Sequence, residues 1–174
     1  LVTEIVGADS DNLHLLKLAN GKIKTLSAPT PRASHGSAGF SWASDSSGFY
    51  YATNRDKEFT AVEYYNVDSG ESEVIAETDA DVSSVKLCGI GDSYLVWTVN
   101  RDGFHQLRIH DLANDDVVSE FELPEGVYRL SCNSGTNRLS VGVNGWRAPG
   151  EVYLIDLAEG STINVFRSNL AGLD

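Results

Sequence analysis

The sequence predicts an all-β protein built from a repeating unit of about 45 residues, and three observations lead to this prediction. A short polar motif recurs after apolar runs, beginning at residues 17, 66, 111 and 156. Each unit contains alternating or aromatic-rich runs typical of strands, separated by turn-forming residues. No stretch has helical spacing long enough to compete. The four copies of the motif are Lys17-Leu18-Ala19-Asn20-Gly21, Asn66-Val67-Asp68-Ser69-Gly70, Asp111-Leu112-Ala113-Asn114-Asp115 and Asp156-Leu157-Ala158-Glu159-Gly160.

The second unit shows the order of strands most clearly. Its four strands are expected at 40–43, 49–53, 61–67 and 73–76, and the third and fourth units repeat this order. Four antiparallel strands in a unit of this length are typical of a β-propeller blade. One blade cannot bury both of its faces alone, so blades stack side by side.

We therefore predict a partial β-propeller of about four blades. The first blade lacks its first strand and the chain has no Met, so we expect a piece of a longer protein; a seven-bladed ring needs roughly 315 residues. Open ends should expose sheet faces and favour self-association. The expected blades are 1–28 (truncated), 38–78, 83–124 and 127–167, with a tail at 168–174.

The composition bears on partners and location. The 25 acidic residues outnumber the 13 Lys and Arg residues, giving a net charge of −12. Nucleic acids and anionic membranes both attract positively charged surfaces, so we expect neither as a partner. No apolar run approaches the roughly 18 residues of a membrane span. No charged-then-apolar segment opens the chain, and we expect a cytoplasmic location.

The chain has two cysteines, Cys88 and Cys132, which lie 44 positions apart. This separation is close to the repeat period, so we expect them at equivalent places in neighbouring blades. Two thiols in a chain of this length do not form a disulfide framework. We therefore expect buried free thiols rather than a bridge.

Turn motifs in the second and third units connect the chain to known propellers. Trp42 and Asp45 match a Trp-Ser-Pro-Asp-Gly turn, although the two residues between them depart from it. Asn54-Arg55-Asp56 and Asn100-Arg101-Asp102-Gly103 match a Ser-Asn-Arg-Asp-Gly turn. These segments resemble the blade consensus shared by TolB and the amino-terminal propellers of prolyl oligopeptidase-type serine peptidases.

The end of the chain favours the peptidase branch. Residues 149–157 and 167–174 are similar to the last blade of acylaminoacyl-peptidase-like members, which leads into an α/β-hydrolase domain. The resemblance implies a non-catalytic propeller that docks on this domain and gates access of short peptides. A TolB-like or free-standing scaffold for protein contacts is the alternative. A third possibility is a small lectin-like propeller that closes by oligomerising.

The chain itself offers no catalytic motif. A nucleophile elbow has the pattern Gly-x-Ser-x-Gly between a strand and a helix. The nearest segment, His35-Gly36-Ser37-Ala38-Gly39, begins with His and precedes no predicted helix. We interpret it as a turn between blades and expect neither catalytic residues nor a cofactor.

Three residues are candidates for contact with a substrate or partner. Arg55 and Arg101 hold the same place in successive blades, and their guanidinium groups could meet a peptide carboxylate. The competing interpretation is a solvated residue in a turn, which is favoured because Gly145 stands there in the next blade. Trp146 lies in the loop 144–150 and is expected to be the most exposed aromatic residue.

No metal site is predicted. His105 and His110 are five positions apart on one expected strand, so their side chains point to opposite faces. The histidines are expected at the surface or in turns, and the recurring aspartates in hairpin turns. These residues are His14, His35, His105 and His110, and Asp68, Asp111 and Asp156.

Overall fold

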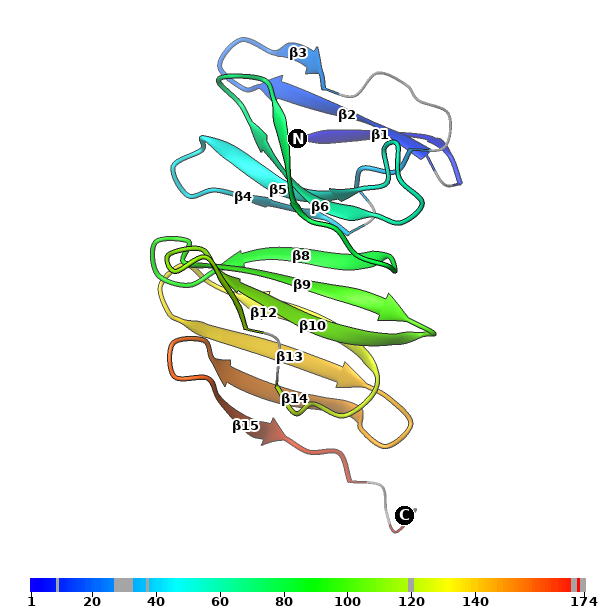
Figure 1. The fold of residues 1–174 in the computed structure, drawn as a ribbon, viewed down its shortest axis with the longest axis vertical. Coiled ribbons are helices and arrows are strands. Elements are labelled where there is room, and N and C mark those ends of the chain that lie inside the picture. The colour runs from blue at the N-terminus through cyan, green and yellow to red at the C-terminus, as the bar shows by residue number, and fades with distance from the viewer. Residues whose placement is uncertain (9, 27–32, 37, 119–120, 170–171, 173–174) are drawn as a thin grey trace. The chain divides into compact units, whose positions relative to one another are not determined.

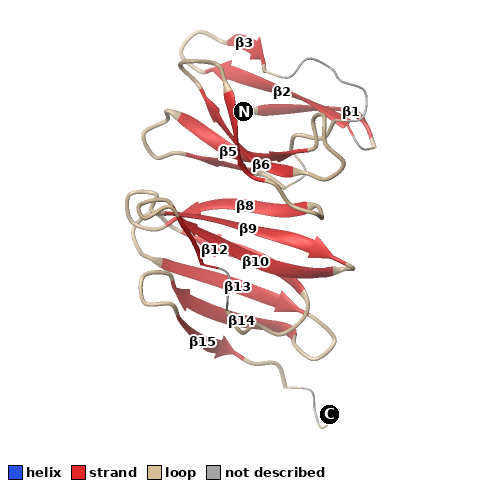
Figure 2. Cartoon of the chain, viewed as in Figure 1, coloured by secondary structure: helices blue, strands red, loops and turns tan. Residues whose placement is uncertain are grey.

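The computed structural model describes residues 1–8, 10–26, 33–36, 38–118, 121–169 and 172, and these residues form strands and loops without a helix (Figures 1 and 2). The strands make four antiparallel sheets, one of three strands and three of four. In every sheet each strand pairs with its neighbour in the chain. The predicted all-β partial propeller, with an incomplete first blade, is confirmed. The described part contains no helix long and apolar enough to span a membrane.

The sheets follow one another along the chain. The first contains β1 (Val2–Gly7), β2 (Ser10–Lys17) and β3 (Lys22–Thr25). The second contains β4 (Phe40–Trp42), β5 (Gly48–Thr53), β6 (Ala61–Asn66) and β7 (Ser72–Ala76). The third contains β8 (Val82–Cys88), β9 (Tyr94–Arg101), β10 (Phe104–Asp111) and β11 (Asp116–Val118). The fourth contains β12 (Val127–Cys132), β13 (Arg138–Asn144), β14 (Pro149–Asp156) and β15 (Ser161–Phe166).

The chain divides into two compact units, residues 1–85 and 86–174, and the boundary falls inside β8. The first unit has an aromatic core around Phe49, which is fully buried. The ring of Phe49 lies 5.3 Å from that of Tyr65 and 5.5 Å from that of Tyr51. Aromatic pairs at such distances stabilise a core beyond the area that they bury.

The second unit has an aliphatic core that follows the two-residue period of its strands. Leu139, Val141 and Val143 alternate along β13 and are almost fully buried. They pack in one cluster with Val96 of β9 and Ile109 of β10. Because successive side chains of a strand point to opposite faces, this alternation places the apolar set on one face of the sheet.

The recurring sequence motif is a hairpin turn held by a side-chain oxygen. The Asp111 carboxylate accepts hydrogen bonds from the backbone N–H groups of Ala113 and Asn114, and Asp156 repeats this arrangement. In the second sheet Asn66, rather than Asp68, accepts the equivalent bonds. Side chains of Asn and Asp favour turns because they can bond to their own backbone in this way.

The two cysteines form a disulfide, so the prediction of free thiols is wrong. Cys88 ends β8 and Cys132 ends β12, and their Cα atoms are 5.7 Å apart. Their equivalent places in successive sheets, which the 44-residue spacing predicts, bring the two side chains together. Disulfides persist mainly in oxidising compartments. The cytoplasmic location stays a prediction.

The first and last sheets expose apolar side chains, as predicted for sheets at open ends. Ile5 of β1 is 82% exposed, and Val6 is more than half exposed. On β15, Ile163, Val165 and Phe166 are each more than half exposed. Such side chains can be covered by further blades or by another chain. Self-association stays a prediction.

Reduction of the disulfide should destabilise the second unit. The bridge closes a loop of 44 residues, and a cross-link of this kind contributes about 2–4 kcal/mol, chiefly by restricting the unfolded chain. We expect Cys88→Ala/Cys132→Ala, or the reduced protein, to unfold at a lower urea concentration. Free thiols titrated in the native oxidised protein, or an unchanged midpoint, would contradict the assignment.

Candidate functional site

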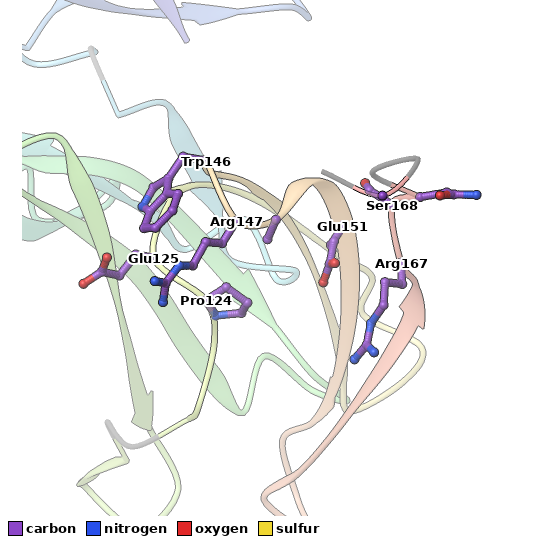
Figure 3. Close-up of a pocket in the computed structure, with 10 residues that line it drawn as sticks. Pro124, Glu125, Trp146, Arg147, Glu151, Arg167 and Ser168 are labelled. Carbon is purple, nitrogen blue, oxygen red and sulfur yellow. The ribbon is translucent and has the colours of Figure 1, made fainter. Parts of the chain in front are cut away.

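A cleft of about 950 Å³ lies in the second unit, among the β11–β12 connection, the β13–β14 loop and the end of β15 (Figure 3). Its lining combines an exposed aromatic residue with two arginines and two acidic residues. We call it the Trp146 cleft. It is lined by Pro124, Glu125, Trp146, Arg147, Ala148, Glu151, Arg167, Ser168, Asn169 and Gly172.

A close backbone approach positions two walls of this cleft. A Cβ atom on Gly145 would collide with the carbonyl oxygen of Glu125, and one on Gly126 would lie 2.8 Å from the carbonyl oxygen of Asn144. Only glycine lets the two segments come this close. Position 145 corresponds to Arg55 and Arg101 of the preceding blades, and this steric requirement explains why it holds glycine instead of arginine. The same approach brings Glu125 and Trp146 to one cleft.

Trp146 is 68% exposed, which confirms the exposure predicted from its loop. The guanidinium carbon of the neighbouring Arg147 lies 4.2 Å from the centre of an indole ring. This cation–π contact holds the planar guanidinium against the ring. Because the N–H groups of Arg lie in the guanidinium plane, a stacked Arg can still donate at its edge. The role of Trp146 as a partner contact stays a prediction.

Glu151 is only 7% exposed and is held by hydrogen bonds from its own sheet. Its Oε2 atom accepts a bond from the Tyr153 hydroxyl at 2.7 Å and one from the Asn164 amide at 2.8 Å. Burial, together with the bond to Glu151, raises the pKa of Tyr153. A buried carboxylate needs such donors to offset its lost hydration.

A second cleft of about 320 Å³ lies beside the Trp146 cleft and contains Arg101. Glu125 lines both clefts, so Arg101 and Trp146 belong to neighbouring hollows of the same unit. At its wall, the ring atom Nδ1 of His105 accepts a hydrogen bond from the backbone N–H of Tyr128 at 3.0 Å. Two of the three candidate contact residues thus line clefts that share Glu125.

Arg55 belongs to the first unit, where it pairs with an acidic residue that sequence reasoning missed. Glu63 is only 2% exposed, and its Oε2 atom lies 3.2 Å from Nη2 of Arg55. Lys57 and the hydroxyl of Tyr51 also contact this carboxylate, at 3.6 Å and 2.8 Å. The available signal was an acidic residue inside the apolar strand run 61–65. Contact of Arg55 with a peptide stays a prediction.

His35 lies in a bend of the connection between β3 and β4, as expected for a turn histidine, but its side chain is buried. It is 1% exposed; its Nδ1 atom lies 2.8 Å from Oγ1 of Thr53, and its backbone N–H donates to Asp11. Within the described residues, its Nε2 atom has no hydrogen-bond partner. Burial lowers the pKa of His35. Ser37, the serine of the elbow-like segment, lies outside the described residues.

The described ranges contain no group of three or more His, Cys, Asp or Glu side chains that could hold a metal ion. The aspartates Asp111 and Asp156 instead hold the hairpin turns described above.

Comparisons with known proteins identify the fold. No protein-family profile and no curated protein matches the sequence. A prolyl endopeptidase structure matches 95% of this chain with a TM-score of 0.77 at 13% identity, and prolyl oligopeptidase B from Galerina marginata matches 95% with 0.74 at 14% identity. TolB from Acinetobacter baumannii matches 94% with 0.67 at 15% identity. The chain spans 24% of the first two proteins and 39% of TolB.

Loss of the Arg55 guanidinium should destabilise the first unit. Removing one partner of a buried ion pair typically costs about 3–5 kcal/mol. Because Arg55 is one-third exposed and Lys57 stays near Glu63, we expect the lower end of this range for Arg55→Ala. Urea unfolding measures the effect, with the exposed Arg129→Ala as a matched control. Equal midpoints for the two variants would contradict a structural role of the pair.

Stability should fall as the solution becomes acidic. The native pKa of His35 is lowered by burial, so below the ordinary value of about 6.5 the unfolded chain binds a proton that the native protein does not. Stability contributed by neutral His35 is therefore present above this pH and is lost as pH falls toward the native pKa. Urea midpoints between pH 7.5 and 5 measure the slope, which His35→Gln should flatten; an unaltered slope in this variant would contradict the assignment.

Proposed function

We propose that this chain is a non-catalytic propeller portion of a prolyl oligopeptidase-like serine peptidase. In this role it docks on an α/β-hydrolase domain of the parent protein and gates or holds peptide substrates. The observation that carries the proposal is the match of nearly the whole chain to about a quarter of two prolyl peptidase structures. The turn motifs at 54–56 and 100–103 agree with this assignment, because they resemble the blade consensus that this family shares with TolB.

The division of labour follows from the residues present. The sequence has no Gly-x-Ser-x-Gly segment, so the parent's hydrolase domain would supply the nucleophile, its base and the oxyanion hole. The blades would supply a steric barrier and a contact surface. The Trp146 cleft provides such a surface, with an exposed indole beside cationic groups.

The second candidate is a TolB-like propeller that scaffolds protein contacts without a peptidase. The match to TolB, which spans 39% of that chain, favours it. The two candidates share the blade consensus, so the blade motifs do not separate them. The presence or absence of an attached hydrolase domain does.

The reading frame beyond Asp174 and the activity of the complete protein distinguish these functions. We expect a downstream Gly-x-Ser-x-Gly segment followed by Asp and then His. The complete protein should react with a fluorophosphonate probe and cleave short peptides, whereas residues 1–174 should do neither. A downstream sequence that holds only further blades, or a complete protein that resists the probe, would contradict the peptidase proposal and leave the scaffold.

A further inference from the structure

We infer that the Trp146 cleft binds a peptide carboxylate that stands next to an apolar side chain. The carboxylate is either the carboxyl terminus of the peptide or an acidic side chain. The inference rests on the proposed function only in taking the ligand to be a peptide. It requires no hydrolase domain, because every residue that carries it lies within the second unit.

The two arginines of the cleft supply the attraction for an anion. Arg147 and Arg167 both line it, in a chain whose acidic residues outnumber its Lys and Arg by 25 to 13. Within the described ranges neither guanidinium forms a salt bridge. The paired N–H groups of Arg match the two oxygens of a carboxylate. Two such groups at one hollow favour an anionic ligand.

The acidic residues of the cleft do not take the place of this ligand. The Glu151 carboxylate is buried and accepts hydrogen bonds from Tyr153 and Asn164. Figure 3 shows the Glu125 carboxylate directed away from the Arg147 guanidinium. Within the described residues, neither acid forms a salt bridge with Arg147 or Arg167. Glu125 also adds a repulsive charge at one wall, which limits where a second acidic group could bind.

Trp146 supplies the apolar half of the recognition. Its indole is 68% exposed at the cleft, with the Arg147 guanidinium 4.2 Å from the ring centre. A ligand side chain that covers the remaining indole surface removes apolar area from water. A carboxylate one residue away can then meet the edge of the stacked guanidinium. A volume of about 950 Å³ lies within the usual range for small-ligand clefts.

Binding of short peptides to residues 1–174 tests the inference, with calorimetry as the readout. The probes are acetyl-Ala-Ala-Phe with a free carboxyl terminus, its amide, and acetyl-Asp-Phe-amide. We expect the free acid or the Asp peptide to bind at least about tenfold more tightly than acetyl-Ala-Ala-Phe-amide. The reason is that a charge-assisted hydrogen bond lowers the dissociation constant by more than about tenfold. Whichever of the two charged probes binds identifies the source of the carboxylate.

Variants separate the cleft from general charge effects. Arg147→Gln and Arg167→Gln should each weaken binding of the charged probe about tenfold, and Trp146→Ala should weaken it as well. Arg129→Gln removes an exposed arginine on β12 of the same unit and should change the affinity less than about twofold. Circular dichroism and urea unfolding confirm that each variant is folded, and Arg147→Lys, which keeps the charge without the planar fork, should bind at an intermediate level.

Three results would overturn the inference. They are absence of binding by every probe, equal affinity for the amide and the charged peptides, and equal losses in Arg129→Gln and the cleft variants. A hydrolase domain found in the complete protein, with any of these results, would overturn this inference while leaving the proposed function in place. Carboxylate-dependent binding, together with a complete protein that has no hydrolase domain, would support this inference and overturn the proposed function.

Discussion

A sheet of four strands cannot bury both of its faces by itself, and this constraint governs the molecule. β9 shows the consequence, because its residues from Tyr94 to Val99 are all buried, on both faces of the strand. β1 shows the opposite case, with every residue exposed and Ile5 among the most exposed apolar side chains. A blade buries both faces of its sheet only when neighbouring sheets pack against it. The exposed apolar side chains of the first and last sheets are therefore where we expect further contacts.

Because strands are buried in this way, their polar side chains need hydrogen-bond partners within the protein. Glu63 and Glu151 lie on the third strands of two different sheets, and each carboxylate is supported by a tyrosine hydroxyl. Glu63 also has a cationic partner, whereas Glu151 is satisfied by an amide. This difference matters for the Trp146 cleft, because Glu151 is stabilised without either arginine that lines it. The guanidinium groups thus remain suited to an external anion.

Sequence periodicity predicts the strands because the interactions that form strands and turns involve residues close together in the sequence. The two-residue alternation of β13 and the Asx turns at Asp111 and Asp156 depend on residues a few positions apart. The blade order and the exposure of Trp146 follow from such local patterns. The sequence therefore predicts the fold class well and one wall of the candidate site.

The features that sequence reasoning missed depend on how strands and loops pair in three dimensions. The Cys88–Cys132 bridge needs the ends of two strands to meet across 44 residues. The partner of Arg55 is set by the hairpin register that places Glu63 opposite Tyr51. In the sequence Gly145 only marks a departure from the pattern of Arg55 and Arg101, whereas in the structure it admits the backbone of Glu125. None of these pairings follows from spacing alone.

The most direct test of ligand binding at the Trp146 cleft is an NMR titration of the ¹⁵N-labelled chain. Its three tryptophans, Trp42, Trp97 and Trp146, give three indole N–H signals. Trp97 is only 3% exposed, so it reports on the core, whereas Trp146 reports on the cleft. The account predicts that a carboxylate-bearing peptide shifts the Trp146 signal and leaves that of Trp97 in place. An unmoved Trp146 signal, or equal shifts at all three, would contradict it.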